Sequence, residues 1–69
     1  MAAAIPRSLS PRQRQVLSLI AEGVRVREIA LRLELSETTV RNHVQGLLQR
    51  LGCHSQLEAV ARARQWRLL

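Results

Sequence analysis

The sequence predicts an all-α domain of four helices, and two observations support this prediction. Apolar residues recur at intervals of three and four, as they do along one side of an amphipathic helix. The clearest such stripe is Val40, Val44, Leu47, Leu48 and Leu51. The only aromatic residue is a single Trp, so the core must be built from Leu, Val, Ile and Ala. A chain of 69 residues makes one domain with a small core, which association with a partner would help to stabilise.

The first helix is expected at 11–22. Ser10 is a natural N-cap, and Gln13 stands three residues after it, as a capping box requires. Pro11 suits the first helical turn, and Gly23 follows where a left-handed residue commonly ends a helix. The side expected to be buried comprises Val16, Leu17 and Ile20.

The second helix is expected at 26–34, with a poorly capped start. Arg25 precedes it and cannot accept a hydrogen bond from the free amides, although Glu28 in the first turn suits the helix dipole. Glu34 stands where the short turn to the next helix needs a positive φ, a strain that Gly would relieve. Two helices joined by so short a turn are typical of a helix-turn-helix. The apolar side comprises Val26, Ile29, Ala30 and Leu33.

The third helix is expected at 37–51, capped by Ser36 and stopped by Gly52. The fourth helix begins at Ser55, where Glu58 is expected to complete a second capping box. Its apolar residues fall on two sides that lie roughly 90° or more apart around the helix. The side expected to face the core comprises Ala59, Val60 and Ala63. The side left for a partner comprises Leu57, Ala61 and Leu68.

The side of the third helix that lies opposite its apolar stripe is unusually short of carboxylates. It carries Thr38, Asn42, Gln45 and Gln49, with Arg41 on the flank. Side chains of these types read base edges or hold phosphates. The chain has 11 cations against 5 acidic residues, a formal net charge of +6, and every cation is Arg. Codon preference in a GC-rich genome would explain the missing Lys equally well, but the net charge indicates a polyanionic partner.

Catalysis and metal binding are not expected. The chain contains no Asp, and Ser36 and Ser55 serve as caps, so no set of nucleophile, base and orienting group can be assembled. His43, Cys53 and His54 are too few for a structural zinc site, and no cofactor is expected. His43 is expected at the edge of the core, or donating to the backbone or a phosphate.

The chain is expected to act in the cytoplasm without a membrane partner. No apolar run approaches membrane-spanning length, and the first residues lack the pattern of a signal peptide. Cys53 has no second Cys to pair with and is expected to pack as a small hydrophobic residue. Residues 1–8 are expected to form a flexible tail or the stub of a linker, and residues 9–69 the domain.

Several stretches together resemble the LuxR/GerE-type helix-turn-helix domain of bacterial transcription regulators. They are LSPRQRQVLSLIAEG, REIALRL, SETTVRNHV, LQRLG and SQLEAVARA. The resemblance implies a four-helix LuxR-type bundle that binds double-stranded DNA in a sequence-specific way and regulates transcription. It implies that the third helix lies in the major groove and that the fourth makes a homodimer contact, so that the dimer reads an inverted repeat. The family usually places this domain behind a receiver or sensing domain, and RNA polymerase is a further expected partner.

Roles follow from the resemblance position by position. It implies base contacts from Arg41, Asn42 and Gln45. It implies phosphate contacts from Arg25, Arg27, Thr38 and Thr39, and Gln49 is expected to join them. It implies a dimer interface at Leu57, Ala61 and Arg64. The family commonly has Ser-Asn where Arg25-Val26 stand, so losing that cap should loosen the second helix by ~1 kcal/mol. It also commonly has acids at Gln13 and Gln15, Arg at Gln56 and Gly at Arg67.

Two alternatives remain open from the sequence. The chain could be a helical adaptor whose fourth helix or basic face binds another protein, or a promoter binder similar to region four of a sigma factor. His43 and the stretch SETTV favour the LuxR type over the sigma factor. A salt titration separates DNA binding from the adaptor function, because neutralising phosphates makes affinity fall steeply with salt.

Overall fold

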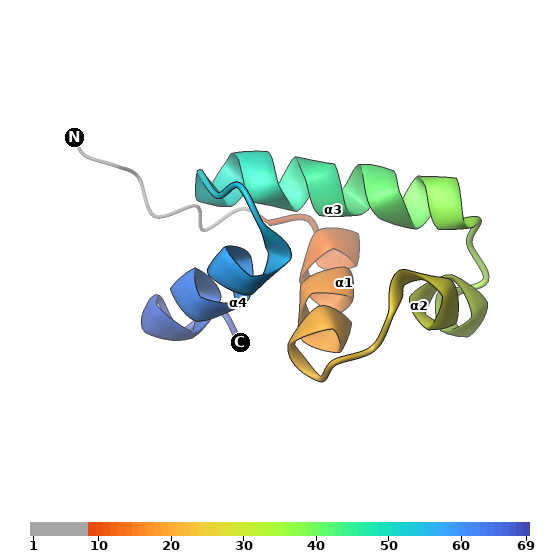
Figure 1. Ribbon diagram of the computed structural model, residues 1–69, viewed down its shortest axis with the longest axis horizontal. Helices are drawn as coiled ribbons and strands as arrows, with labels where there is room; N and C mark the ends of the chain where they lie inside the picture. The colour runs from red at the N-terminus through yellow and green to blue at the C-terminus, as the bar shows by residue number, and fades with distance from the viewer. Residues whose placement is uncertain (1–8) are drawn as a thin grey trace.

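The computed structural model describes residues 9–69, which form four helices and no strand. These are α1 (Pro11–Ala21), α2 (Val26–Leu33), α3 (Glu37–Leu51) and α4 (Gln56–Gln65). The predicted all-α class and the order of the helices are confirmed. The tail expected at 1–8 lies outside the described residues. Figure 1 shows α3 running along one side of the molecule, with α4, α1 and α2 ranged beneath it and α1 in the middle.

The first helix starts with the predicted capping box. The Gln13 amide donates to Ser10 Oγ at 3.0 Å, and the Ser10 amide donates to Gln13 Oε1 at 2.9 Å. These two bonds satisfy amides that have no partner within the helix, which fixes where α1 begins. The chain leaves α1 through Gly23, whose φ of 86° is the left-handed conformation expected there.

The turn between α2 and α3 has the predicted geometry. Glu34 has φ 57° and ψ 45°, the left-handed conformation, and the amide of Leu35 donates to the carbonyl of Ala30 at 2.9 Å. Ser36 then caps α3, since its Oγ accepts from the Thr39 amide at 3.0 Å. Arg25 makes no side-chain cap at the start of α2, as predicted. The short turn, with the Leu35 bond and the Ser36 cap, fixes α3 relative to α2.

The cap of α4 differs from the prediction in one bond. Ser55 Oγ accepts from the Glu58 amide at 3.1 Å, as expected. The Glu58 carboxylate, however, accepts from the amide of His54 at 2.8 Å, one residue before the cap. Its other oxygen lies 3.4 Å from Arg62, so the side chain is held between two partners. The Ser55 cap predicted for the fourth helix is therefore confirmed. The second bond of the capping box is wrong, because Glu58 accepts from the amide of His54 and not from that of Ser55.

The core gathers residues from all four helices, and α3 packs against each of the other three. Its fully buried large side chains are Val16 and Leu17 of α1, Ile29 of α2, and Val40, Leu47 and Leu51 of α3. Ala59 and Ala63 close it from α4, and Cys53 is buried beside them, as predicted for a small hydrophobic residue. The core face predicted for the fourth helix is therefore confirmed.

The placement of Leu68 on the partner side of the fourth helix is wrong. Helix α4 ends at Gln65, and Arg67 then adopts φ 57°, which turns the chain back. The amide of Leu68 donates to the carbonyl of Ala63 at 2.7 Å, and its side chain packs against the core. A helical wheel does not extend past the end of a helix, and this is why the prediction failed.

Candidate nucleic-acid interface

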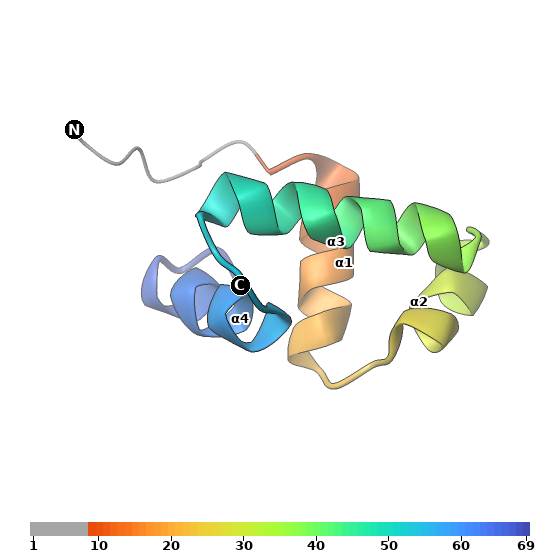
Figure 2. The same cartoon turned by 45° about the horizontal axis from the view of Figure 1, so that its top comes forward.

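The outer face of α3 is open to solvent. Thr38, Arg41, Asn42, Gln45 and Gln49 are all exposed, while the opposite side of the helix is buried in the core. In Figure 2 the molecule is turned so that α3 comes forward, and the other helices lie behind or beside it. A helix presented in this way, with polar side chains outward, has the form needed to enter a DNA major groove.

Arg41 has a neighbour that the sequence analysis overlooked. Its Nη2 lies 3.3 Å from Oε1 of Glu37, one turn earlier on α3. The two side chains are 62% and 44% exposed, and a pair so exposed contributes at most ~0.5 kcal/mol. The guanidinium can therefore exchange this carboxylate for a phosphate or a guanine edge at little cost.

The first turn of α3 presents the positive end of the helix dipole to solvent. Thr38 is exposed there, and Thr39 is half-buried. The Ser36 hydroxyl donates to Thr39 Oγ1 at 2.9 Å, so both side chains take part in the cap. The Thr39 oxygen is thus held in place, and its own hydroxyl proton remains to be donated.

Arg25 and Arg27 stand at the start of α2 and are both exposed. Neither forms an ion pair within residues 9–69. Figure 1 shows α2 beneath the N-terminal end of α3. Two guanidinium groups therefore extend the positive potential that surrounds this end of α3.

The residues expected at a dimer interface lie on the outer side of α4. Leu57 is 81% exposed, the most exposed large apolar side chain among the described residues, and Ala61 and Arg64 are also exposed. Val60 is half-buried against the core. The fourth helix therefore has one face in the core and an apolar residue left in water, as its sequence pattern indicated.

Arg62 is the structural residue that the sequence analysis missed. Its Nη1 donates to the carbonyl of Leu51 at 2.9 Å and to that of Gly52 at 3.1 Å, at the C-terminal end of α3. Its guanidinium carbon also lies 5.7 Å from the centre of the Trp66 ring. A cation at this end of a helix is stabilised by the dipole and satisfies carbonyls that lack helical partners. Arg62 thus ties the end of α3 to α4.

No metal or membrane chemistry emerges from the described residues. Between residues 9 and 69, the His, Cys and Glu side chains form no cluster of three that could hold a metal ion. None of the described helices combines the length and apolar character needed to cross a bilayer.

Burial raises the pKa of the Cys53 thiol, an effect that Arg62 partly offsets and Glu58 reinforces. His43 is half-buried, which fits the expected place at the core edge.

Comparison with known proteins decides the family. The family model described as GerE, bacterial regulatory proteins of the luxR family, matches residues 7–63. The chain belongs to the luxR family. This confirms the LuxR/GerE-type resemblance and makes the chain a helix-turn-helix DNA-binding domain of a transcription regulator, not an enzyme.

Two luxR-family relatives and one solved structure show the extent of the similarity. The nitrate/nitrite response regulator protein NarL of Escherichia coli (strain K12) is 40% identical over 60 residues, which cover 87% of this chain and 28% of NarL. The spore germination protein GerE of Bacillus subtilis (strain 168) is 40% identical over 52 residues, 75% of this chain and 70% of GerE. A solved structure of the transcription factor GerE aligns with a TM-score of 0.84 and 31% identity, covering 91% of this chain and 96% of that one. The chain thus spans less than a third of the length of NarL.

Proposed function

We propose that the domain binds double-stranded DNA in a sequence-specific manner by inserting α3 into the major groove. The observation that carries the proposal is the outer face of α3, which is polar, exposed and bordered by Arg41. In this proposal Arg41, Asn42 and Gln45 contact base edges, since a guanidinium pairs with guanine and carboxamides pair with adenine.

Phosphate contacts in the proposal surround the base-reading side chains. Arg25 and Arg27 approach the backbone from the start of α2, and Thr38 and Thr39 from the first turn of α3, with Gln49 further along the helix. Exposed guanidinium and hydroxyl groups support these roles, together with the dipole of α3. Such contacts orient a protein on the duplex without reading its sequence.

We further propose that two copies associate through Leu57, Ala61 and Arg64 and bind an inverted repeat. The exposed Leu57 supports this, because an apolar side chain in water gains from being covered by a second copy. In a symmetric dimer the two α3 helices would reach half-sites about one turn, ~10 bp, apart. The proposed setting is the bacterial cytoplasm, with RNA polymerase as a further partner.

Selection of bound sequences from a random duplex pool tests the proposal directly. We expect one enriched motif with two-fold symmetry, and an affinity that falls with salt at a log-log slope near −0.9 per phosphate neutralised. An affinity that is flat between ~50 and ~200 mM salt would instead favour the adaptor function, with acidic proteins as the ligands.

Matched substitutions separate the proposed base contact from a phosphate contact. Arg41→Ala should weaken binding to the selected site by ~1 to 3 kcal/mol and relax preference at one base pair. Arg27→Ala should weaken all sequences about equally and lower the salt slope by about one. Equal losses on selected and random DNA for Arg41→Ala would remove it from the base-reading set.

The proposed dimer has its own test. Leu57→Asp should leave the fold intact, because the side chain is exposed, but lower affinity for the inverted repeat. Sedimentation of the protein with and without a duplex measures the association. A monomer at every concentration, with cooperativity on DNA unchanged by Leu57→Asp, would assign α4 another role.

A further inference from the structure

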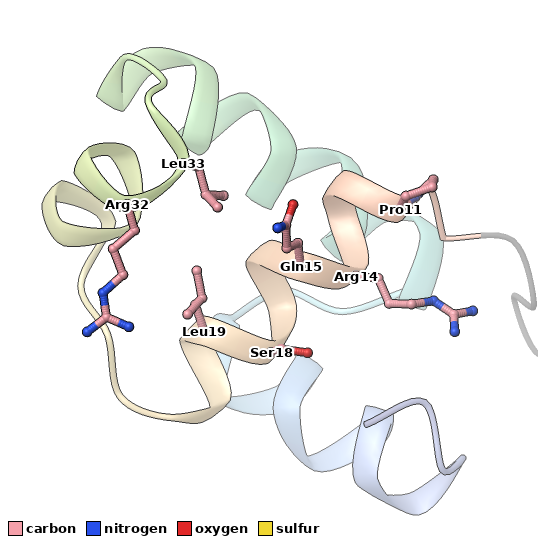
Figure 3. A pocket seen from close by; sticks show the side chains of 7 residues that line it. All are labelled: Pro11, Arg14, Gln15, Ser18, Leu19, Arg32 and Leu33. Carbon is pink, nitrogen blue, oxygen red and sulfur yellow. The ribbon is translucent and has the colours of Figure 1, made fainter.

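A groove of about 500 Å³ lies between α1 and α2, apart from the residues proposed to contact DNA. Leu19 of α1 and Leu33 of α2 point toward one another across it, as Figure 3 shows. Pro11 adds a third apolar side chain, and Arg14 and Arg32 extend from opposite ends. The groove therefore combines an apolar floor with a cationic group at each end.

The groove opens away from the outer face of α3. Helix α1 faces α3 with its Gln13 side, where Gln13 Nε2 lies close to the backbone of Gly46 in α3. At 100° per residue, the groove-lining residues Pro11, Gln15 and Ser18 lie roughly 140° or more from Gln13 around α1. A molecule seated in the groove would thus leave the outer face of α3 free for DNA.

The two guanidinium groups are available to a ligand. Arg14 forms no ion pair among the described residues. Arg32 pairs with Glu28 at 3.1 Å, but both side chains are about half exposed, so the pair contributes little and can be exchanged. Among residues 9–69, neither guanidinium forms a hydrogen bond or ion pair with another helix.

We propose that this groove docks an acidic amphipathic helix of a partner protein. Two large apolar side chains one turn apart would cover Leu19 and Leu33, and carboxylates at either end would meet Arg14 and Arg32. A duplex does not fit this chemistry, because it offers phosphates but no apolar side chains. A second copy of this chain, docking through α4, does not fit either. The exposed apolar face of α4 carries Arg64, and not the carboxylate that would pair with Arg14 or Arg32.

A displayed library of amphipathic peptides, panned on the protein alone and on its complex with a selected duplex, tests the proposal. We expect enriched peptides to carry paired apolar residues flanked by Asp or Glu, and to bind in both formats. The combined variant Arg14→Glu and Arg32→Glu should weaken them by about tenfold or more, whereas Arg12→Glu, in the same helix but outside the groove, should not. Fluorescence anisotropy with a labelled enriched peptide measures the change.

Three outcomes would overturn the proposal. It is overturned if no peptide is enriched, or if the enriched peptides are insensitive to the double charge reversal. It is also overturned if the reversal weakens duplex binding by the same factor, because that result would assign the two arginines to phosphates. Duplex binding unchanged by the reversal, with peptide binding lost, supports it. A protein that binds peptide but no duplex would refute the DNA-binding proposal while leaving this one standing.

Discussion

Replacing Arg62 should destabilise the junction between α3 and α4, and should cost more than replacing Arg32 or Arg41, whose one-turn ion pairs are more exposed. The side chain donates to two carbonyls at the end of α3, pairs with Glu58 at 3.4 Å and lies over the ring of Trp66. Arg62→Met keeps the length of the aliphatic stem but removes all donors and the charge. The carbonyls are then left to water or remain unpaired.

The magnitude follows from these contacts. A hydrogen bond from a charged donor contributes ~1.5 to 3 kcal/mol, but the Arg62 side chain is 34% exposed, so the lower end applies. The ion pair adds ~0.3 to 0.5 kcal/mol and the ring contact ~0.5 to 1 kcal/mol. Because the contributions share one group they do not simply add, and we expect a loss of about 2 kcal/mol. In a domain of this size that corresponds to a Tm lower by about 8 to 16 °C.

Urea and thermal unfolding, followed by circular dichroism, measure the effect. Arg32→Met is the matched control, because Arg32 makes the same one-turn ion pair, with Glu28, but caps no helix. It should cost at most ~0.5 kcal/mol. Arg62→Lys, which keeps the charge but loses the planar fork, should fall between the two. If Arg62→Met costs no more than Arg32→Met, the carbonyl contacts contribute nothing and the reasoning fails.

Three further predictions concern the backbone, a close helix contact and pH. Arg67→Gly should stabilise the domain by ~0.5 to 1 kcal/mol in urea unfolding, because Arg67 has φ 57°, whereas Glu22→Gly, at φ −82°, should destabilise it. In Gly46→Ala the new Cβ would lie 2.8 Å from Gln13 Nε2, and this close contact should offset the ~1 kcal/mol that Ala gains over Gly in a helix, so the change should be near neutral. In a Gln13→Ala background the contact is absent, and the same substitution should stabilise the domain by ~1 kcal/mol. Equal effects in both backgrounds would contradict this. Burial raises the pKa of Cys53 in the folded state, so the contribution of the neutral thiol to stability is complete below its ordinary pKa of 9.0 and is lost as pH rises toward the folded pKa. Cys53→Ala should flatten that part of a stability–pH profile.

The features predicted correctly from the sequence are those fixed by neighbours along the chain. The capping box at Ser10, the cap at Ser36 and the left-handed residue at Glu34 each depend on residues within four or five positions, so the pattern contains the information. The buried stripe of α3 follows in the same way from its periodicity. Local hydrogen bonds and amphipathic spacing are enough to set where these helices begin, end and face.

The features missed depend on how the helices are arranged. Arg62 caps a helix that ends about ten residues earlier, and in the sequence it resembles any solvated cation. The sequence does not show that α4 ends at Gln65, so the helical wheel of the fourth helix was extended to Leu68, which lies beyond the helix. For the proposed DNA contacts, the sequence indicated which residues share a face of α3, and the structure adds that this face is exposed and that Glu37 lies beside Arg41.

Trp66 gives this domain an intrinsic optical probe at a useful place. The chain has no Tyr or Phe, so all its near-ultraviolet emission arises from this one indole. The ring follows α4 directly, packs against the core and lies beneath the Arg62 guanidinium, which itself holds the end of α3. Emission from unlabelled protein therefore reports on the joint between the helix proposed to read DNA and the helix proposed to pair with a second copy.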